Sequence, residues 1–309
     1  MRTIPALALS SIVLATLTAC TGGPFTAGCA PLVSGGAASA LVDAPGDIGS
    51  APIVDFPTPI ISDGIETDTI IHGDGRTVNA GDTVTIKYSL YNGATGQGLG
   101  SSGYAHDGDL LTLGSANAAD VVSDSLECVT VGSRIAIVAS ALAVHGGQGD
   151  ASIGVGPNDS IVYVIDVVDA YPNQANGAPQ PAQAGMPSVV TAPGGAPGIS
   201  IPRLAAPVEV AVAQLKIGSG NELTAGDRVL AKFTSVNWDT GTVVDSTWTT
   251  GRATIIPLSD GGSVPQPVVD ALTGSTVDSQ VLVVIPAGDT SANTLVYVVD
   301  VLGILPATD

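Results

Sequence analysis

The sequence predicts an α+β protein with two tandem domains, each a twisted antiparallel sheet of about five strands around one short helix. The first observation behind this prediction is an internal repeat: residues 72–82 (HGDGRTVNAGD) recur as residues 217–227 (IGSGNELTAGD). The second is a set of β-branched runs in both copies, and the third is one short amphipathic stretch per copy. Because solenoid repeats have periods of about 20–50 residues, copies of roughly 100 residues indicate two whole domains.

The two copies keep the same register over most of their length. Residues 88–96 (YSLYNGATG) correspond to residues 233–241 (FTSVNWDTG), and the closing segments 160–166 (SIVYVID) and 294–300 (TLVYVVD) are nearly identical. We therefore expect one fold to be used twice.

The strands are predicted from periodicity. Residues 83–89 and 228–234 alternate apolar with other side chains at period two, which is typical of strands with two different faces. Residues 134–139 (RIAIVA) and 280–285 (QVLVVI) are almost uninterrupted apolar runs, which predicts a central strand in each copy.

Turns and one helix complete each copy. Asn92-Gly93 and residues 239–241 have the composition of hairpin turns. A short helix is predicted between the hairpin and the central strand, because three apolar residues share one helical face. These residues are Val121, Val122 and Leu126 in the first copy, and Val268, Val269 and Leu272 in the second.

The N-terminus has the pattern of an export signal. Arg2 precedes an apolar run over residues 4–17, which is too short to span a bilayer, and Leu-Thr-Ala-Cys follows at residues 17–20. This box resembles the bacterial lipobox, which implies cleavage before Cys20 and acylation of its thiol. An ordinary secretory signal with an incidental cysteine is the alternative. We expect an extracytoplasmic protein, lipid-anchored to the outer face of the bacterial cell membrane.

Composition shifts predict the domain boundaries. Residues 1–19 are the signal peptide and residues 20–48, rich in Gly, Ala and Ser, are the lipidated tether. The first domain with its N-terminal arm spans residues 49–171, a linker without periodicity spans 172–184, and the second domain with its arm spans 185–309.

Charge and cysteine content narrow the class of partner. Without Arg2, 8 basic residues (9 − 1) face 28 acidic ones, so nucleic acid is not an expected partner. The membrane is expected to be contacted through the lipid anchor only. With Cys20 acylated, Cys29 and Cys128 remain and an oxidising compartment lets them pair; two buried free thiols are the alternative. Three histidines at no metal-ligand spacing predict no metal, and no cofactor is expected.

Several motifs in order resemble those of the FKBP-type peptidyl-prolyl isomerases. The second copy has Gly226-Asp227 before a strand, Phe233 within that strand, and then residues 241–247 (GTVVDST). Residues 281–286 (VLVVIP) and 294–302 (TLVYVVDVL) are similar to the last two strands of that family. The first copy matches at Gly81-Asp82, Tyr88, Ser101-Ser102, 131–134 and 161–168. The resemblance covers about residues 64–170 and 208–305, and it implies two FKBP-like domains.

The resemblance implies an isomerase that acts on proline-containing polypeptides and aids the folding of exported proteins. Isomerisation needs a water-poor pocket and a hydrogen-bond donor for the twisted amide, and no nucleophile. The residues implied for catalysis are Phe233, Asp245 and Tyr297. Those implied for substrate binding are Val244, Ile255, Val264 and Val268 in the second copy, and Tyr88, Leu99, Leu111, Val122, His145 and Tyr163 in the first.

Departures from the family pattern predict weak activity. A valine replaces the tryptophan of the pocket floor in both copies, and Leu99-Gly100 replaces the Phe-Asp pair in the first. The second copy keeps Asp245 and is therefore the domain expected to be active. The alternatives are a module of the same fold that binds polypeptides without catalysis, and a passive envelope protein.

Overall fold

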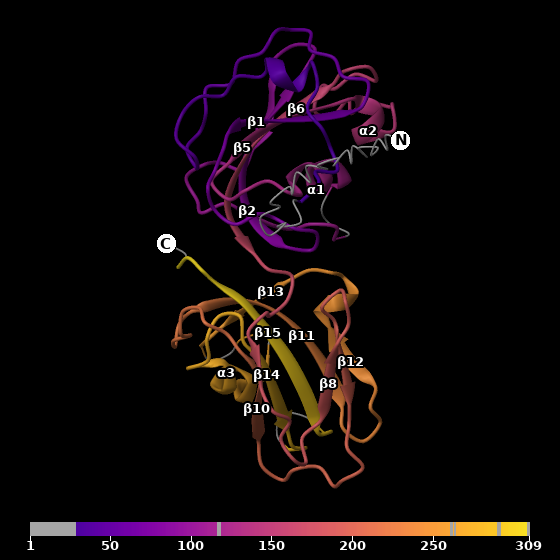
Figure 1. The fold of residues 1–309 in the computed structure, drawn as a ribbon. Helices are drawn as coiled ribbons and strands as arrows, with labels where there is room; N and C mark the ends of the chain where they lie inside the picture. The colour runs from indigo at the N-terminus through magenta and orange to yellow at the C-terminus, as the bar shows by residue number, and fades with distance from the viewer. Residues whose placement is uncertain (1–28, 116–118, 260–261, 263, 289–291, 308–309) are drawn as a thin grey trace, which may run out of the picture. The chain divides into compact units, whose positions relative to one another are not determined.

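The structure is a computed structural model that describes residues 29–115, 119–259, 262, 264–288 and 292–307 (Figure 1). The proposed signal peptide and Cys20 lie outside the described residues. No helix in the described part of the chain is long and apolar enough to cross a membrane.

The predicted α+β class, with one helix in each five-stranded domain, is wrong. Within the described residues, 38% of the chain is strand and 9% is helix, with fifteen strands in three antiparallel sheets and three α-helices. The main sheets have six and seven strands, since short strands beside the long hairpins were not predicted, and the helices have only five to seven residues. The first domain also contains a second helix. The protein is therefore predominantly β.

The first sheet has the order β1-β5-β6-β2-β3. Strand β4 also pairs with β2, along the part of β2 that β3 does not reach. Strands β2 and β6 pair along their whole length, from Thr83 opposite Tyr171 to Asn92 opposite Ile161. The elements are a 3-10 helix η1 (Ser39–Leu41), β1 (Ile65–Ile71), β2 (Thr83–Asn92), β3 (Gly98–Ser101), β4 (Asp109–Thr112), α1 (Asp120–Leu126), β5 (Arg134–Ala139), α2 (Ala141–His145) and β6 (Ile161–Tyr171).

The second main sheet has the order β12-β11-β15-β14-β10-β7, and β13 pairs with β11; β8 and β9 form a separate hairpin. Strand β7 lies in the segment predicted as a linker and pairs with Lys216 and Ile217. The elements are β7 (Ala178–Pro179), β8 (Ser188–Thr191), β9 (Pro197–Ser200), β10 (Ala211–Ile217), β11 (Arg228–Asn237), β12 (Val243–Ser246), η2 (Thr247–Thr249), β13 (Thr254–Pro257), α3 (Gln266–Leu272), β14 (Gln280–Ile285) and β15 (Leu295–Leu305).

The sequence repeat is also a repeat of strand pairing. Leu90 on β2 lies opposite Tyr163 on β6, and Ser235 on β11 lies opposite Tyr297 on β15. Leu90 and Ser235 hold matching positions in the sequence repeat, so their partners Tyr163 and Tyr297 hold equivalent positions in the two sheets. Side chains of directly paired residues also lie on the same face of a sheet.

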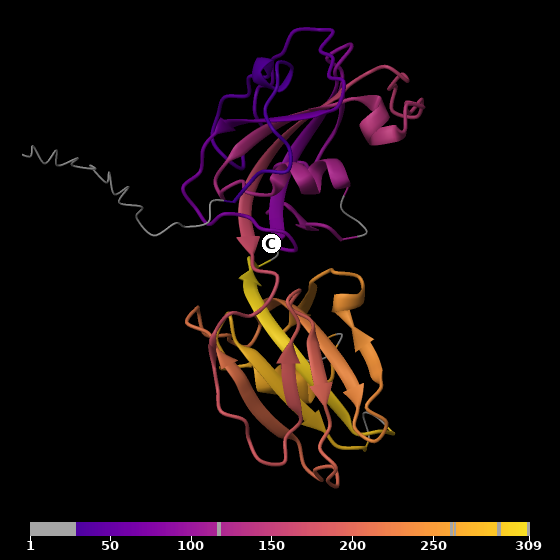
Figure 2. The same cartoon turned by 45° about the vertical axis from the view of Figure 1, so that its right-hand side comes forward.

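Each main sheet is buried on both faces. One face packs on the helix, and the other packs on the extended segment that precedes the domain. In the first domain the arm, which in the structure includes part of the segment predicted as the tether, contributes Val42, Ala44 and Ile60 to a cluster with Val138 and Val162. In the second domain the apolar side chains from residues 185–206 that cover the sheet are Met186, Val189, Ile199 and Ile201. Figures 1 and 2 show the first arm, in indigo, running beside its sheet. Burial on both faces explains why β5 and β14 read as continuous apolar runs.

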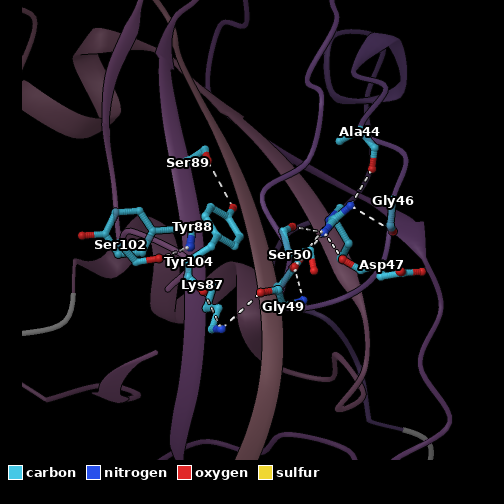
Figure 3. Close-up of polar contacts among 12 residues, drawn as sticks. Ala44, Gly46, Asp47, Gly49, Ser50, Lys87, Tyr88, Ser89, Ser102 and Tyr104 are labelled. Atoms are coloured by element: carbon cyan, nitrogen blue, oxygen red, sulfur yellow. Dashed lines mark hydrogen bonds and ion pairs between the residues drawn. The ribbon is translucent and has the colours of Figure 1, made fainter. Parts of the chain in front are cut away.

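A buried ion pair holds the first arm in place. Arg134 on β5 and Asp166 on β6 are directly paired, their side chains have 0% exposure, and Arg134 Nε lies 2.6 Å from Asp166 Oδ1. Asp166 Oδ2 also accepts a hydrogen bond from the Gly49 N–H at 2.7 Å, and Lys87 donates to the Gly49 carbonyl at 3.1 Å. The rest of the guanidinium donates to arm carbonyls, those of Ala44, Gly46, Asp47 and Ser50 (Figure 3).

In the second domain, the acid on the last strand has an uncharged partner in place of the arginine. Gln280 replaces the arginine and donates to Asp300 at 2.7 Å, and Asp300 accepts from the Ala175 N–H at 2.9 Å. Lys216 donates to the Ala175 carbonyl at 2.7 Å. Burial raises the pKa of Asp300, while the hydrogen bonds from Gln280 and Ala175 oppose that rise. In both domains an acid on the last strand therefore fixes the preceding segment.

Cys29 and Cys128 are disulfide-bonded, as the composition predicted. Cys128 follows α1 and has a left-handed backbone with φ of 71°.

We predict that Arg134→Met lowers the free energy of unfolding by about 3–5 kcal/mol, because it leaves the Asp166 carboxylate buried without its charged partner. Urea unfolding measures the change. Arg228→Met is the matched control, since Arg228 is partly exposed and, within the described part of the chain, its side chain donates to the Pro306 carbonyl alone. It should change stability by less than about 1 kcal/mol. Equal effects of the two substitutions would contradict the structural role of the buried pair.

Candidate functional site

Two aromatic rings form the centre of the candidate site in the second domain. Phe233 on β11 and Tyr297 on β15 have ring centroids 6.0 Å apart at an angle of 38°. Their side chains are only 8% and 9% exposed, and both belong to the core between sheet and helix. Val264 and Val268 lie in the same cluster. Four of the residues implied by the FKBP resemblance are thus gathered in one place.

A polar row crosses the sheet beside these rings. Ser235 on β11 lies opposite Tyr297 on one side and Asp245 on the other. The Ser235 side chain is fully buried and donates to the Asp245 backbone carbonyl at 3.4 Å, and it lies near enough to Tyr297 to affect the pKa of that hydroxyl. This Tyr297–Ser235–Asp245 row brings a phenol, an alcohol and a carboxylate to the edge of an apolar core.

Burial determines the protonation of the tyrosine. It raises the pKa of Tyr297, the Ser235 hydrogen bond opposes that rise, and the nearby Asp245 carboxylate adds to it. Tyr297 therefore stays a neutral hydroxyl at physiological pH and remains able to donate a hydrogen bond.

Val244 and Asp245 lie at the exposed edge of the sheet. The pairing register shifts between Val243 and Asp245, which marks a β-bulge, and both valines point to solvent with exposures of 60% and 57%. Bulges are common beside active sites, where they redirect a side chain.

Ile255 lies away from the other predicted residues. It pairs with Leu230 and packs in a different cluster, whereas Ile256 is fully buried beside Phe233 and Val264. A shift of one residue moves a strand side chain to the opposite face. Sequence reasoning missed Ile256, because residues 254–257 (TIIP) contain two adjacent isoleucines and no alternation that tells them apart.

The first domain has the same shell without the polar row. Tyr88, Leu99 and Tyr163 lie in or against its helix-side cluster, and Leu111 and Val122 pack there too. Leu90 and Gly100 take the places of Ser235 and Asp245, since Leu90 pairs with both Gly100 and Tyr163. Burial alone raises the pKa of Tyr163.

His145 ends the short helix α2 of the first domain. Its Nε2 is buried without a hydrogen-bond partner in the described part of the chain. Its neighbour Val144 packs against the helix-side cluster.

The aromatic pair is a packed core rather than an open pocket. Five of the cavities among the described residues have volumes of about 260–680 Å³, and none of these five is lined by Phe233 or Tyr297. The 680 Å³ cavity lies beside Gly226, Val269 and Thr273. The exposed edges of the rings, with Val244 and Asp245 beside them, form a rim at the surface.

No protein-family profile and no curated protein matches the chain. Among solved structures, it is similar to the three FKBP domains of wheat FKBP73, with 18% identity and a TM-score of 0.35 over 78% of this chain and 95% of that one. It is also similar to a peptidyl-prolyl cis-trans isomerase from Pseudomonas syringae pv. tomato, with 17% identity and a TM-score of 0.31 over 36% of this chain and 77% of that one.

We predict that Tyr297→Phe reduces the loss of stability at alkaline pH. Folding raises the pKa of Tyr297 above its value of about 10 in the unfolded chain. The resulting stabilisation is fully present below the pKa of the unfolded state, and it is lost as the pH rises through the pKa of the folded state. Urea unfolding between about pH 9 and 11 should show a shallower fall for the variant than for the parent protein. Identical pH profiles would contradict the burial of this hydroxyl.

Proposed function

We propose that the protein binds proline-containing segments of exported polypeptides and catalyses their cis-trans isomerisation weakly, at the second domain. The observation that carries this proposal is the Tyr297–Ser235–Asp245 row at the edge of the Phe233–Tyr297 core. The ordered FKBP-like motifs in the sequence support the same reaction.

The row offers what the reaction needs from a protein. Rotation about an X–Pro bond crosses a barrier of about 18–20 kcal/mol that arises from amide resonance. The twisted transition state has lost that resonance, so an apolar, water-poor surface favours it over the planar amide. The neutral Tyr297 hydroxyl is able to donate to the amide carbonyl, and Ser235 lies opposite Tyr297 on the neighbouring strand. Asp245 lies where it can orient the chain on either side of the proline.

Two features of this site favour low activity. The rings are at most 9% exposed, so a proline side chain reaches them only at their rim. Val268 is fully buried and offers no aromatic floor. In the first domain, Leu90 and Gly100 remove both polar groups, and activity is expected to be lower still.

The same closed rings favour a second candidate function. A polypeptide held at the rim by Val244 and Asp245 would be bound without isomerisation, which describes a binding module that has lost catalysis. The refolding experiments below separate these two functions.

The proposed location is the outer face of a bacterial cell membrane, with the lipid on Cys20. The support for this location is the N-terminal sequence pattern and the acidic composition. A lipid-anchored tether would place both domains where newly exported chains emerge.

Tyr297→Phe is predicted to reduce the acceleration of proline-limited refolding by about tenfold, because it removes the donor to the twisted amide. The assay uses the full-length protein in detergent and a substrate whose slow refolding phase is limited by X–Pro isomerisation. Tyr163→Phe is the matched control, as this hydroxyl holds the same place in the first sheet without the polar row, and it should leave the rate unchanged. If Tyr163→Phe is the more harmful substitution, activity resides in the first domain and the proposal fails.

Asp245→Ala is predicted to lower the same rate several-fold, whereas Asp239→Ala, in the exposed hairpin turn, should not. Gly100→Asp tests the converse by restoring the missing acid in the first domain. A Cβ at Gly100 meets no atom within 4 Å, so the substitution fits the fold, and it should raise activity. If the parent protein binds unfolded chains but accelerates nothing, the binding module replaces the isomerase.

Cys20→Ala should block lipidation, so that the protein is released from membranes or keeps its signal peptide. Membrane fractionation and intact mass of the purified protein measure the outcome. Unchanged membrane association together with a cleaved, unmodified N-terminus would exclude the proposed anchor.

A further inference from the structure

Strand β10 has an open, uncharged outer edge. On its inner side, residues 211–214 pair regularly with β14. On its outer side, β7 pairs only with Lys216 and Ile217, and the Gln180 N–H donates to the Leu215 carbonyl at 2.9 Å. No described segment pairs with residues 211–214 on that side, so their outward N–H and C=O groups are available to another strand.

The equivalent edge of the first domain is covered. Strand β1 corresponds to β10, since Thr67 lies opposite Ile137 just as Val212 lies opposite Val283. There the Thr67 N–H donates to the Ser34 carbonyl at 3.1 Å. A loop of the arm, residues 34–38, which leads into η1, thus lies against the edge of β1.

Two acids fasten that covering segment, and β10 lacks both of them. Glu66 accepts from the Ala38 and Ser39 N–H groups at 2.7 and 3.1 Å, and Asp68 accepts from the Ser39 hydroxyl at 2.7 Å. The corresponding residues of β10 are alanines, Ala211 and Ala213. The second domain therefore has the same edge strand but lacks the two carboxylates that hold the arm against it in the first domain.

Apolar groups border the open edge of β10. Val210 and Val212 are 47% and 42% exposed. A cavity of about 260 Å³ runs beside the strand and is lined by Pro181, Met186, Val189, Ala213 and Leu215 among others. Gln214, which also lines it, has a buried side-chain oxygen without a hydrogen-bond partner in the described part of the chain.

We infer that the outer edge of β10 binds an extended polypeptide segment as an added strand. The cavity would receive the side chains on one face of the added strand, and Val210 and Val212 would contact those on the other. The net charge of −19 disfavours a second copy of this chain as the occupant and favours a segment that carries basic residues. This surface lies apart from the Tyr297–Ser235–Asp245 row and requires no proline.

The test uses full-length protein in detergent and a fluorescein-labelled peptide of alternating valine and threonine with a lysine at each end. Fluorescence anisotropy should show saturable binding. In an added strand, every second amide N–H faces the neighbouring strand and the others face away. Two N-methylated peptides are therefore compared. Methylation of the amides that face β10 should abolish binding, and methylation of the amides that face away should not.

The matched variants are Val212→Glu and Val208→Glu. Both variants add the same negative charge, which attracts the lysines of the probe equally. A loss of affinity of tenfold or more in Val212→Glu, without a loss in Val208→Glu, would therefore show that the peptide binds at the edge of β10. Val208, 91% exposed and outside the strand, should tolerate the change. Asp245→Ala should leave peptide binding unchanged, which separates this surface from the proposed prolyl site.

Three results would overturn the inference. The first is no binding of the peptide, and the second is equal binding of the two N-methylated peptides or of the two glutamate variants. The third is a dimer in sedimentation that Val212→Glu dissociates, because a second copy would then occupy the edge.

Discussion

The buried contact between Asp166 and Arg134 is the interaction on which the first domain depends. A guanidinium and a carboxylate with 0% exposure are stable only if their remaining hydrogen-bonding groups are satisfied, and here the backbone of the arm satisfies them. Fixing the arm in this way covers the face of the sheet that the helix leaves open. The domain consequently has two apolar cores, one on each side of a single sheet.

The second domain solves the same problem with different chemistry. Asp300 keeps the position of Asp166, but Gln280 supplies an uncharged donor and Lys216 holds the Ala175 carbonyl from the neighbouring strand. The conserved geometry lies in the strand pairing, and the side chains that use it differ. The candidate site also combines matching strand pairing with different side chains. Leu90 and Gly100 occupy the paired positions in the first sheet, and Ser235 and Asp245 occupy them in the second.

Much of each sheet could be predicted from the sequence, because period-two alternation in β2 and β11 and the repeat itself are local signals. The predicted helices α1 and α3 also follow from local amphipathicity. The class prediction failed because the short strands β4, β7 and β13 carry little periodic signal and pair only through tertiary contacts. The covering of the second face also has no local signal, although the unbroken apolar runs of β5 and β14 were compatible with it. Ile255 was chosen in place of Ile256 because a one-residue shift is invisible without the pairing partner.

The central claim is that an acid on the last strand holds each arm over its sheet. Hydrogen–deuterium exchange of the arm amides in Asp166→Asn and Asp300→Asn tests it most directly. The account predicts that Asp166→Asn speeds exchange across residues 42–60 while the amides of β5 and α1 stay protected, and that Asp300→Asn does the same for residues 175–201 in the second domain. Arm protection unchanged in both variants would contradict the claim.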